Sequence, residues 1–320
     1  MKLNLKKIIS LLLPIALGVF LIIYAYQKFE PEEIAIIKQQ FVQADYTFIF
    51  LSLLFNLVAL WSRATRWNIT LQHLGYTSKG VNRFFAVCIS YLMNMTIPRS
   101  GELSRALFLK KYDDVPVDKS FGSIIGERLV DLIFLLCFIV LAFIVQFEIL
   151  KKFVLDQISF SNLIIIGSVL ALIGSVGLYL YLKSTHPKIL CFKNKISGLV
   201  EGFLSITQLQ QWKAFWLHSF LIWLCYFAMF YITIFALPET SSLSLGGVLM
   251  AFIVGGLAIT LTNSGFGTYP FLIAEILFFY GIASTAGTSF GWIIWTSQTL
   301  FIVLLGSLSF ILAPILNQKN

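Results

Sequence analysis

Charged residues are scarce in this 320-residue chain: Asp, Glu, Lys and Arg together make up 12% of it, whereas 58% of the residues are hydrophobic. Soluble domains carry about 25% charged residues, so the composition excludes an ordinary soluble protein and predicts a multi-pass membrane protein. No stretch long enough for a soluble catalytic domain remains once the apolar segments are assigned to the membrane. The net charge of +8 then belongs mainly to cytoplasmic loops, which are rich in Lys and Arg. Without a long basic face or a nucleic-acid motif, no nucleic-acid partner is expected.

Cysteine and histidine are also rare, and their spacing excludes several kinds of site. The four cysteines form no CxxC motif and are expected to be small buried hydrophobes. The histidines have no metal-ligand spacing, and the sequence contains no HExxH, Walker or dinucleotide motif and no Ser-His-Asp set. We therefore expect no metal, no cofactor and no enzymatic activity. The residues concerned are Cys88, Cys137, Cys191, Cys225, His73, His186 and His218.

Long apolar runs predict an all-α, polytopic transmembrane helical bundle of seven or eight spans, forming a single integral membrane domain over residues 1–320. A membrane-spanning helix needs about 20 predominantly apolar residues. The expected spans are 8–26, 46–61, 129–147, 163–182, 215–237, 245–261 and 290–316.

The distribution of charge between these spans predicts their orientation. Lysines before the first span place the N-terminus in the cytoplasm, and the acidic segment 29–44 lies outside. A signal peptide is the alternative for 8–26, but its apolar core would be shorter and no small-x-small cleavage site follows. Residues 190–209 have a mixed polar pattern that suits an amphipathic helix along the membrane interface.

Two apolar segments, 84–101 and 262–283, are interrupted. The apolar part of the first, 84–97, is about 14 residues long, which is short for a span and typical of a re-entrant segment. Basic loops flank it on both sides, so a segment that dips into the membrane and returns keeps both loops cytoplasmic. Pro98 and Gly101 suit the turn. Broken segments in corresponding halves indicate a binding cavity in transporters, although a surface loop is the alternative, and whether 263–283 crosses stays open.

Six ionisable residues beside apolar segments form the main candidate site, because charges close to hydrocarbon are costly. They are Arg99, Glu102, Arg105, Glu127, Arg128 and Asp131. On helices, the first three share one side and the last three can reach a common side. Three interpretations stay open: a neutral ion network that clamps the hairpin to the next helix, arginines that bind an anionic headgroup, and a proton relay through Glu127 or Asp131.

A second group of arginines follows the apolar run 46–61. Trp61, Arg63, Arg66 and Trp67 are expected to anchor the helix end at the membrane interface. Binding of lipid phosphate is the alternative function of this group.

The motifs Pro98-Arg99-Ser100-Gly101-Glu102-Leu103-Ser104-Arg105-Ala106 and Gly126-Glu127-Arg128-Leu129-Val130-Asp131 resemble the signature of the lysylphosphatidylglycerol synthase transmembrane-region family, whose members are also called flippase-like integral membrane domains. Gly265-Phe266-Gly267, Gly281 and Trp295-Thr296-Ser297-Gln298-Thr299 resemble the Gly-rich second half of the family. That half usually starts with Pro-Gly-Gly and often has a Glu after GxG. This chain instead has Asn263-Ser264-Gly265 and Pro270, with Glu275 nearby.

The resemblance implies a helical bundle with re-entrant helices that moves a lipid between leaflets. Because the aminoacyl-transferase domain of the best-known members is absent, lysyl transfer is not expected. We expect a flippase or transporter of an anionic phospho- or glycolipid in the bacterial inner (cytoplasmic) membrane. The alternatives are a scaffold for a lipid- or envelope-modifying enzyme and an intramembrane enzyme. The oligomeric state stays open. Besides the six charged residues, the expected substrate-binding set includes Asn94, Asn263, Gly265 and Gly267.

Overall fold

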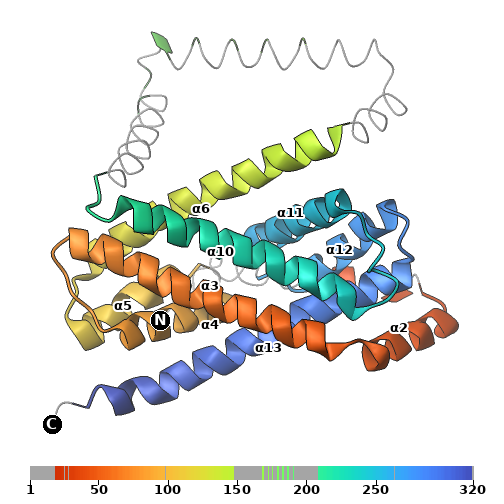
Figure 1. Cartoon of the computed structure of the whole chain (residues 1–320), viewed down its shortest axis with the longest axis horizontal. Coiled ribbons are helices and arrows are strands. Elements are labelled where there is room, and N and C mark those ends of the chain that lie inside the picture. The colour runs from red at the N-terminus through yellow and green to blue at the C-terminus, as the bar shows by residue number, and fades with distance from the viewer. Residues whose placement is uncertain are drawn as a thin grey trace. The chain divides into compact units, whose positions relative to one another are not determined.

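The computed structural model describes residues 19–24, 26–27, 29–97, 99–147, 208–262 and 264–318, together with single positions between 168 and 190 (Figure 1). Within these ranges every regular element is a helix. The chain forms two compact units, one of residues 1–127 and 213–320 and the other of residues 128–212. Most of each predicted helix at 8–26, 163–182 and 190–209, and the residues Pro98 and Asn263, lie outside the described residues.

Four of the described helices are long and apolar enough to cross a membrane. They are α3 (Tyr46–His73), α6 (Val117–Val145), α10 (Trp212–Thr233) with its 3-10 extension η1 (Ile234–Ala236), and α13 (Ser284–Leu316). The shorter helices are α2 (Pro31–Gln43), α4 (Gly80–Thr96), α5 (Gly101–Asp113), α11 (Leu245–Leu261) and α12 (Thr268–Phe279). The expected all-helical membrane class is confirmed, whereas the described residues do not establish seven or eight spans.

Several helix boundaries differ from the prediction because charged residues do not end these helices. α3 continues past Trp61 to His73, and α6 begins at Val117 rather than at 129. The predicted ends at these two positions are wrong. Arg63 and Arg66 on α3 and Glu127 on α6 are buried in protein, so these helices can continue through them without the cost of exposing the three charges to hydrocarbon. α5 and α2 are also helical, in segments that were expected to be loops.

The first interruption separates α4 from α5, which pack against each other. The Asn94 side-chain oxygen accepts a hydrogen bond from the backbone N–H of Gly101 (2.7 Å), and the hydroxyl of Ser100 donates to the carbonyl of Met93 (3.0 Å). Arg99 has a positive φ of 61°. A Cβ on Gly101 would overlap the carbonyl oxygen of Ser90. Glycine therefore allows the start of α5 to approach the α4 backbone.

The second interruption separates α11 from α12. Ser264, Gly265 and Gly267 have φ values of 55°, 74° and 67°, in the left-handed region that glycine adopts at low cost. Trp295 of α13 donates its indole N–H to the carbonyl of Ser264 (2.9 Å). The two interruptions meet, because the hydroxyl of Ser264 donates to the backbone carbonyl of Asn94 (3.4 Å).

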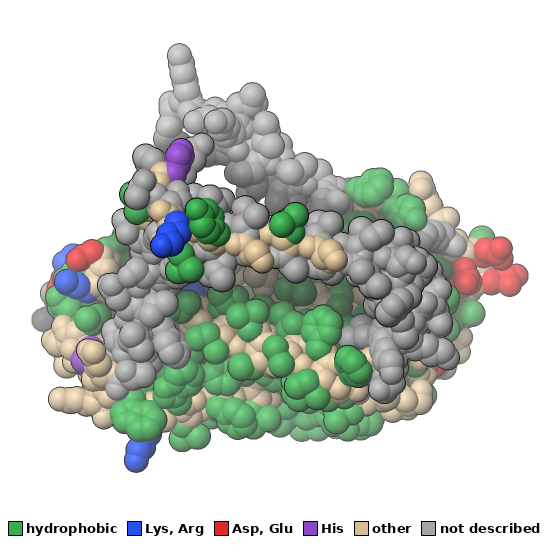
Figure 2. All heavy atoms as spheres, turned by 90° about the horizontal axis from the view of Figure 1, so that it is seen from above, with side chains coloured by type: hydrophobic (Ala, Val, Ile, Leu, Met, Phe, Trp, Pro, Cys, Tyr) green, Lys and Arg blue, Asp and Glu red, His purple; other side chains and the backbone are tan. Residues whose placement is uncertain are grey.

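Within the first unit, polar and charged side chains meet near both ends of α13. Near its N-terminal end, Ser289 donates to Gln40 (2.8 Å), which donates to Glu239 (2.8 Å). At its C-terminal end, Asn317 contacts Asn82 (2.8 Å) and Lys79 (3.4 Å). Figure 2 shows acidic side chains gathered around α2, beside a largely hydrophobic face.

Candidate functional site

The centre of the site is an ion pair between α5 and the first part of α6. Nη1 of Arg105 lies 2.9 Å from Oε2 of Glu127, and the two side chains are 1% and 0% exposed. Both residues belong to the ion network that was one of the three interpretations of the charged motifs. Because both charges are removed from solvent, each depends on the other for compensation of its lost hydration.

A second guanidinium approaches the same carboxylate oxygen from α3. Nη2 of Arg66 lies 3.8 Å from Oε2 of Glu127, and the Arg66 side chain is fully buried. Its Nη1 donates to the hydroxyl of Ser219 on α10 (3.1 Å), and its Cζ lies 5.5 Å from the ring centroid of Phe215. Glu127 thus joins two arginines from helices far apart in the sequence.

An aromatic ring completes this cluster. The Cζ atom of Arg105 lies 3.8 Å from the ring centroid of Trp67, within the range of a cation–π interaction. The indole N–H of Trp67 donates to the hydroxyl of Ser123 (2.9 Å). We call Arg66, Trp67, Arg105 and Glu127 the Glu127 cluster.

The expected interface anchor at the end of the apolar run 46–61 is wrong for three of its four residues. Arg63, Arg66 and Trp67 are 2%, 0% and 0% exposed, whereas Trp61 is 56% exposed. An anchor would place its polar groups in the headgroup region, but these three side chains point into protein. The i, i+3 spacing of the two arginines was the available signal, because it places both on one side of a helix that continues past Trp61.

Arg63 and two tyrosines form a further polar contact among α3, α10 and α4. Nη2 of Arg63 lies 3.3 Å from the hydroxyl of Tyr226, which lies 2.9 Å from the hydroxyl of Tyr91. One residue earlier, the hydroxyl of Ser62 lies 2.8 Å from Nδ1 of His218. Neither contact was predicted, since the partners are more than a hundred residues apart and no local pattern relates them.

Four charged candidates remain. Arg128 and Asp131 form an i, i+3 pair at 3.5 Å within the second unit. Arg99 is exposed, and Glu102 is partly buried.

Three uncharged candidates have backbone roles. Asn94 binds the start of α5, and Gly265 and Gly267 shape the second interruption through their positive φ angles. Asn263 is outside the described residues.

A polar cluster outside the long helices holds α4, α5 and α13 together. The Asn82 amide donates to Asp113 (2.8 Å) and to Asn317 (3.0 Å). Burial raises the pKa of Asp113, while the hydrogen bond from Asn82 and the charges of Lys79 and Arg83 oppose this increase. The cluster fixes the ends of the α4–α5 pair and thereby the position of Arg105.

Comparison with known proteins agrees with the membrane character of these helices. The profile of the lysylphosphatidylglycerol synthase TM region matches residues 11–306. A UPF0104 membrane protein of Methanocaldococcus jannaschii is 24% identical over 255 residues, which cover 71% of this chain and 73% of the relative. A UPF0104 membrane protein of Pyrococcus horikoshii is 27% identical over 129 residues, which cover 39% of this chain and 38% of the relative. No solved structure was found to match. With nearly its whole length matched, this multi-pass membrane protein belongs to the lysylphosphatidylglycerol synthase transmembrane-region family.

Proposed function

We propose that this protein binds an anionic phospho- or glycolipid and moves it between the leaflets of a bacterial cytoplasmic membrane. The observation that supports this function is the approach of Arg66 and Arg105 to the same buried oxygen of Glu127. Guanidinium groups bind phosphate and carboxylate in similar geometries. The carboxylate of Glu127 therefore occupies a position that suits an oxygen of a lipid phosphate.

In this mechanism Glu127 acts as an internal substitute for the substrate. While no lipid is bound, the carboxylate lowers the cost of keeping Arg66 and Arg105 away from water. An entering phosphate displaces the Glu127 carboxylate and forms an ion pair with one or both arginines. These residues act in binding rather than in catalysis. The ion network is the state of the site without lipid, and the headgroup complex is its state with lipid bound.

The two interruptions form the path to this site. We propose that α4 and α5 enter the membrane from the cytoplasmic side and return, because basic residues lie at both outer ends of the pair. The α11–α12 interruption forms the facing wall, which the hydrogen bond between Ser264 and Asn94 supports. Broken helices are tolerated at membrane depth where protein or a wet cavity covers their backbone.

Leaflet transfer in liposomes tests the function. The purified protein is reconstituted with fluorescent phosphatidylglycerol or phosphatidylcholine, and a membrane-impermeant quencher reports the lipid that reaches the outer leaflet. We expect Arg66→Gln and Arg105→Gln to slow transfer of phosphatidylglycerol at least about tenfold, because each variant loses a phosphate-binding group worth about 1.5–3 kcal/mol. Lys110→Gln is the matched control, since Lys110 is 53% exposed on the same helix as Arg105.

Wild-type transfer by both variants would rule out the arginine site, provided that each variant elutes as a folded protein. Arg99→Gln and Arg128→Gln in the same assay test the other two arginines of the sequence motifs. Absence of transfer by the wild-type protein, with co-purification of a lipid-modifying enzyme, would favour a scaffold function instead.

A further inference from the structure

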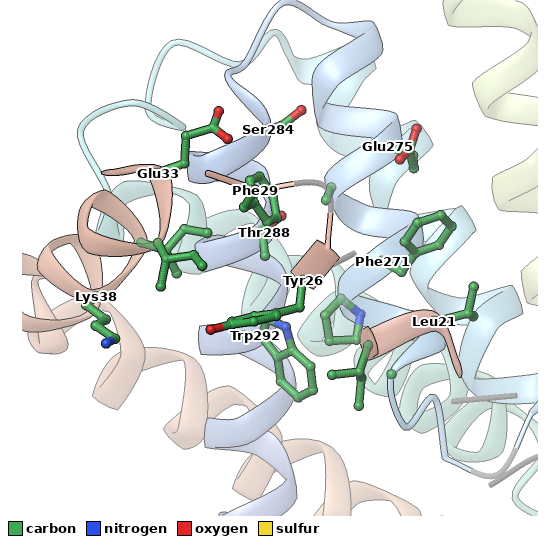
Figure 3. A pocket seen from close by; sticks show the side chains of 16 residues that line it. Leu21, Tyr26, Phe29, Glu33, Lys38, Phe271, Glu275, Ser284, Thr288 and Trp292 are labelled. Atoms are coloured by element: carbon green, nitrogen blue, oxygen red, sulfur yellow. The ribbon is translucent and has the colours of Figure 1, made fainter. Parts of the chain in front are cut away.

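An open pocket with a volume of about 580 Å³ lies away from the Glu127 cluster and shares no residue with it. It is formed by α2, α12, the first part of α13 and residues between 21 and 29 (Figure 3). Its volume is within the range of about 300–1,000 Å³ that is typical of small-molecule sites.

Four of the sixteen lining residues are aromatic. They come from different segments, Tyr26 and Phe29 from the stretch before α2, Phe271 from α12 and Trp292 from α13. In Figure 3 the rings of Tyr26 and Trp292 lie across the middle of the pocket. The negative faces of such rings attract organic cations, most strongly where water is partly excluded.

The charged lining residues have a net charge of −1, with Glu33 and Glu275 as acids and Lys38 as the single base. In Figure 3 the two carboxylates lie on the side of Ser284, and the Lys38 ammonium lies away from Glu275. Glu275 is the one charged residue of α12, whose other side chains are apolar or uncharged. An ionised group in an otherwise apolar helix is costly and indicates a function.

Glu33 also has a local structural contact. One of its carboxylate oxygens accepts the backbone N–H of Glu30 (3.0 Å), which caps the start of α2. This bond holds the carboxylate in place without removing its charge. The pocket therefore combines a fixed carboxylate, a second carboxylate from a different helix and an aromatic surface.

We propose that this pocket binds the organic ammonium group of an amphiphile, with its apolar chain along the aromatic lining. The carboxylates of Glu33 and Glu275 supply the opposite charge, and Tyr26 and Trp292 supply ring faces for the cation. The site differs from the Glu127 cluster in the charge of its ligand, and the proposal does not depend on leaflet transfer of an anionic lipid.

The direct test uses water-soluble probes that share a six-carbon chain: hexyltrimethylammonium, hexanoate and hexyl glucoside. Binding to the purified full-length protein is measured by isothermal titration in maltoside micelles, which contain no ammonium group. We expect the cationic probe to bind at least about tenfold more tightly than the other two, a difference of about 1.4 kcal/mol. Glu275→Gln and Trp292→Leu should each weaken its binding at least fivefold.

Glu32→Gln is the matched control, because Glu32 is exposed on α2 and is absent from the pocket lining. The binding constant of hexyltrimethylammonium should be the same for Glu32→Gln as for the wild type. Equal affinity for the three probes, preference for the glucoside or the carboxylate, or unchanged binding in Glu275→Gln would each overturn the proposal.

A second measurement identifies the source of the ammonium group. The protein is placed in phosphatidylglycerol nanodiscs that contain a minor fraction of phosphatidylethanolamine, and retained lipids are identified by native mass spectrometry. Retention of phosphatidylethanolamine by the wild type but not by Glu275→Gln assigns the site to a lipid headgroup. Binding of hexyltrimethylammonium without such retention assigns it to a free amphiphile, and absence of both overturns the proposal.

Discussion

Glu127 has a different role in the cluster from either arginine that it contacts. The same carboxylate oxygen of Glu127 is approached by the guanidinium groups of both Arg66 and Arg105. Removing one partner of a buried ion pair destabilises a protein mainly because the other charge remains buried. Loss of Glu127 removes a carboxylate that two buried guanidinium groups share, whereas loss of either arginine leaves Glu127 with the other guanidinium group.

We therefore expect Glu127→Gln to lower the thermal stability of the detergent-solubilised protein more than Arg66→Gln or Arg105→Gln does. Breaking one buried pair costs about 3–5 kcal/mol. The stability lost in Glu127→Gln should exceed the stability lost in either single arginine variant. Tryptophan fluorescence during heating measures the transition. Lys110→Gln, which breaks the exposed pair with Asp114, should shift it little. A larger loss in Arg105→Gln than in Glu127→Gln would contradict the shared role of the carboxylate.

At the scale of elements, the α4–α5 pair determines where Arg105 lies. Its turn is held by the Asn94 side chain and by the hydroxyl of Ser100, and it depends on the absence of a side chain at Gly101. Arg105 follows one helical turn later on the same helix, so a shift of the start of α5 moves its guanidinium relative to Glu127.

Gly101→Ala should consequently destabilise the protein and reduce lipid transfer, because the new Cβ meets the backbone carbonyl of Ser90 as well as the side chain of Asn94. Overpacking of this kind costs about 1–3 kcal/mol. Gly126→Ala is the control, since no atom lies within 4 Å of its added Cβ and alanine favours the helix. Thermal unfolding should show a lower midpoint for Gly101→Ala and an unchanged or higher one for Gly126→Ala. The reverse order would show that the close approach does not limit the hairpin.

Across the first unit, the basic side chains beside one end of α13 predict how the protein lies in the membrane. Lys79 lies near the C-terminal end of α13, and Glu239 lies near the N-terminal end through Gln40. Exposed apolar side chains on α3 and α13, among them Phe50, Leu300 and Ile311, suit contact with lipid between these ends. Cytoplasmic segments carry the excess of Lys and Arg, so the Lys79 end should face the cytoplasm.

Cysteine labelling in intact cells tests this orientation. In a background without the four native cysteines, Glu32→Cys should react with a membrane-impermeant maleimide from outside the cell. Lys111→Cys should react only after the membrane is permeabilised. Both positions are exposed, so accessibility to the reagent depends on the side of the membrane. Labelling of Lys111→Cys in intact cells would show that the protein has the opposite orientation.

The sequence by itself determined the membrane class, the helical architecture and the two interruptions, because these depend on local properties: the length of apolar runs and the turn preferences of residues such as Gly265 and Gly267. Residues 245–261 were predicted as a helix and form α11 with the same bounds. One interpretation of the charged motifs, an ion network that clamps the hairpin to the next helix, included both Arg105 and Glu127.

Only the tertiary structure decided which charges are buried together. Arg66 and Trp67 of α3 belong to the Glu127 cluster, and Arg66 also contacts Ser219 of α10, although the sequence indicated an interface anchor at residues 61–67. Arg99, in the same motif as Arg105, is exposed. The sequence pattern of a charged residue at the end of an apolar run is the same whether lipid headgroups or another helix surround that residue. The distinction depends on contacts between segments that are distant in the sequence.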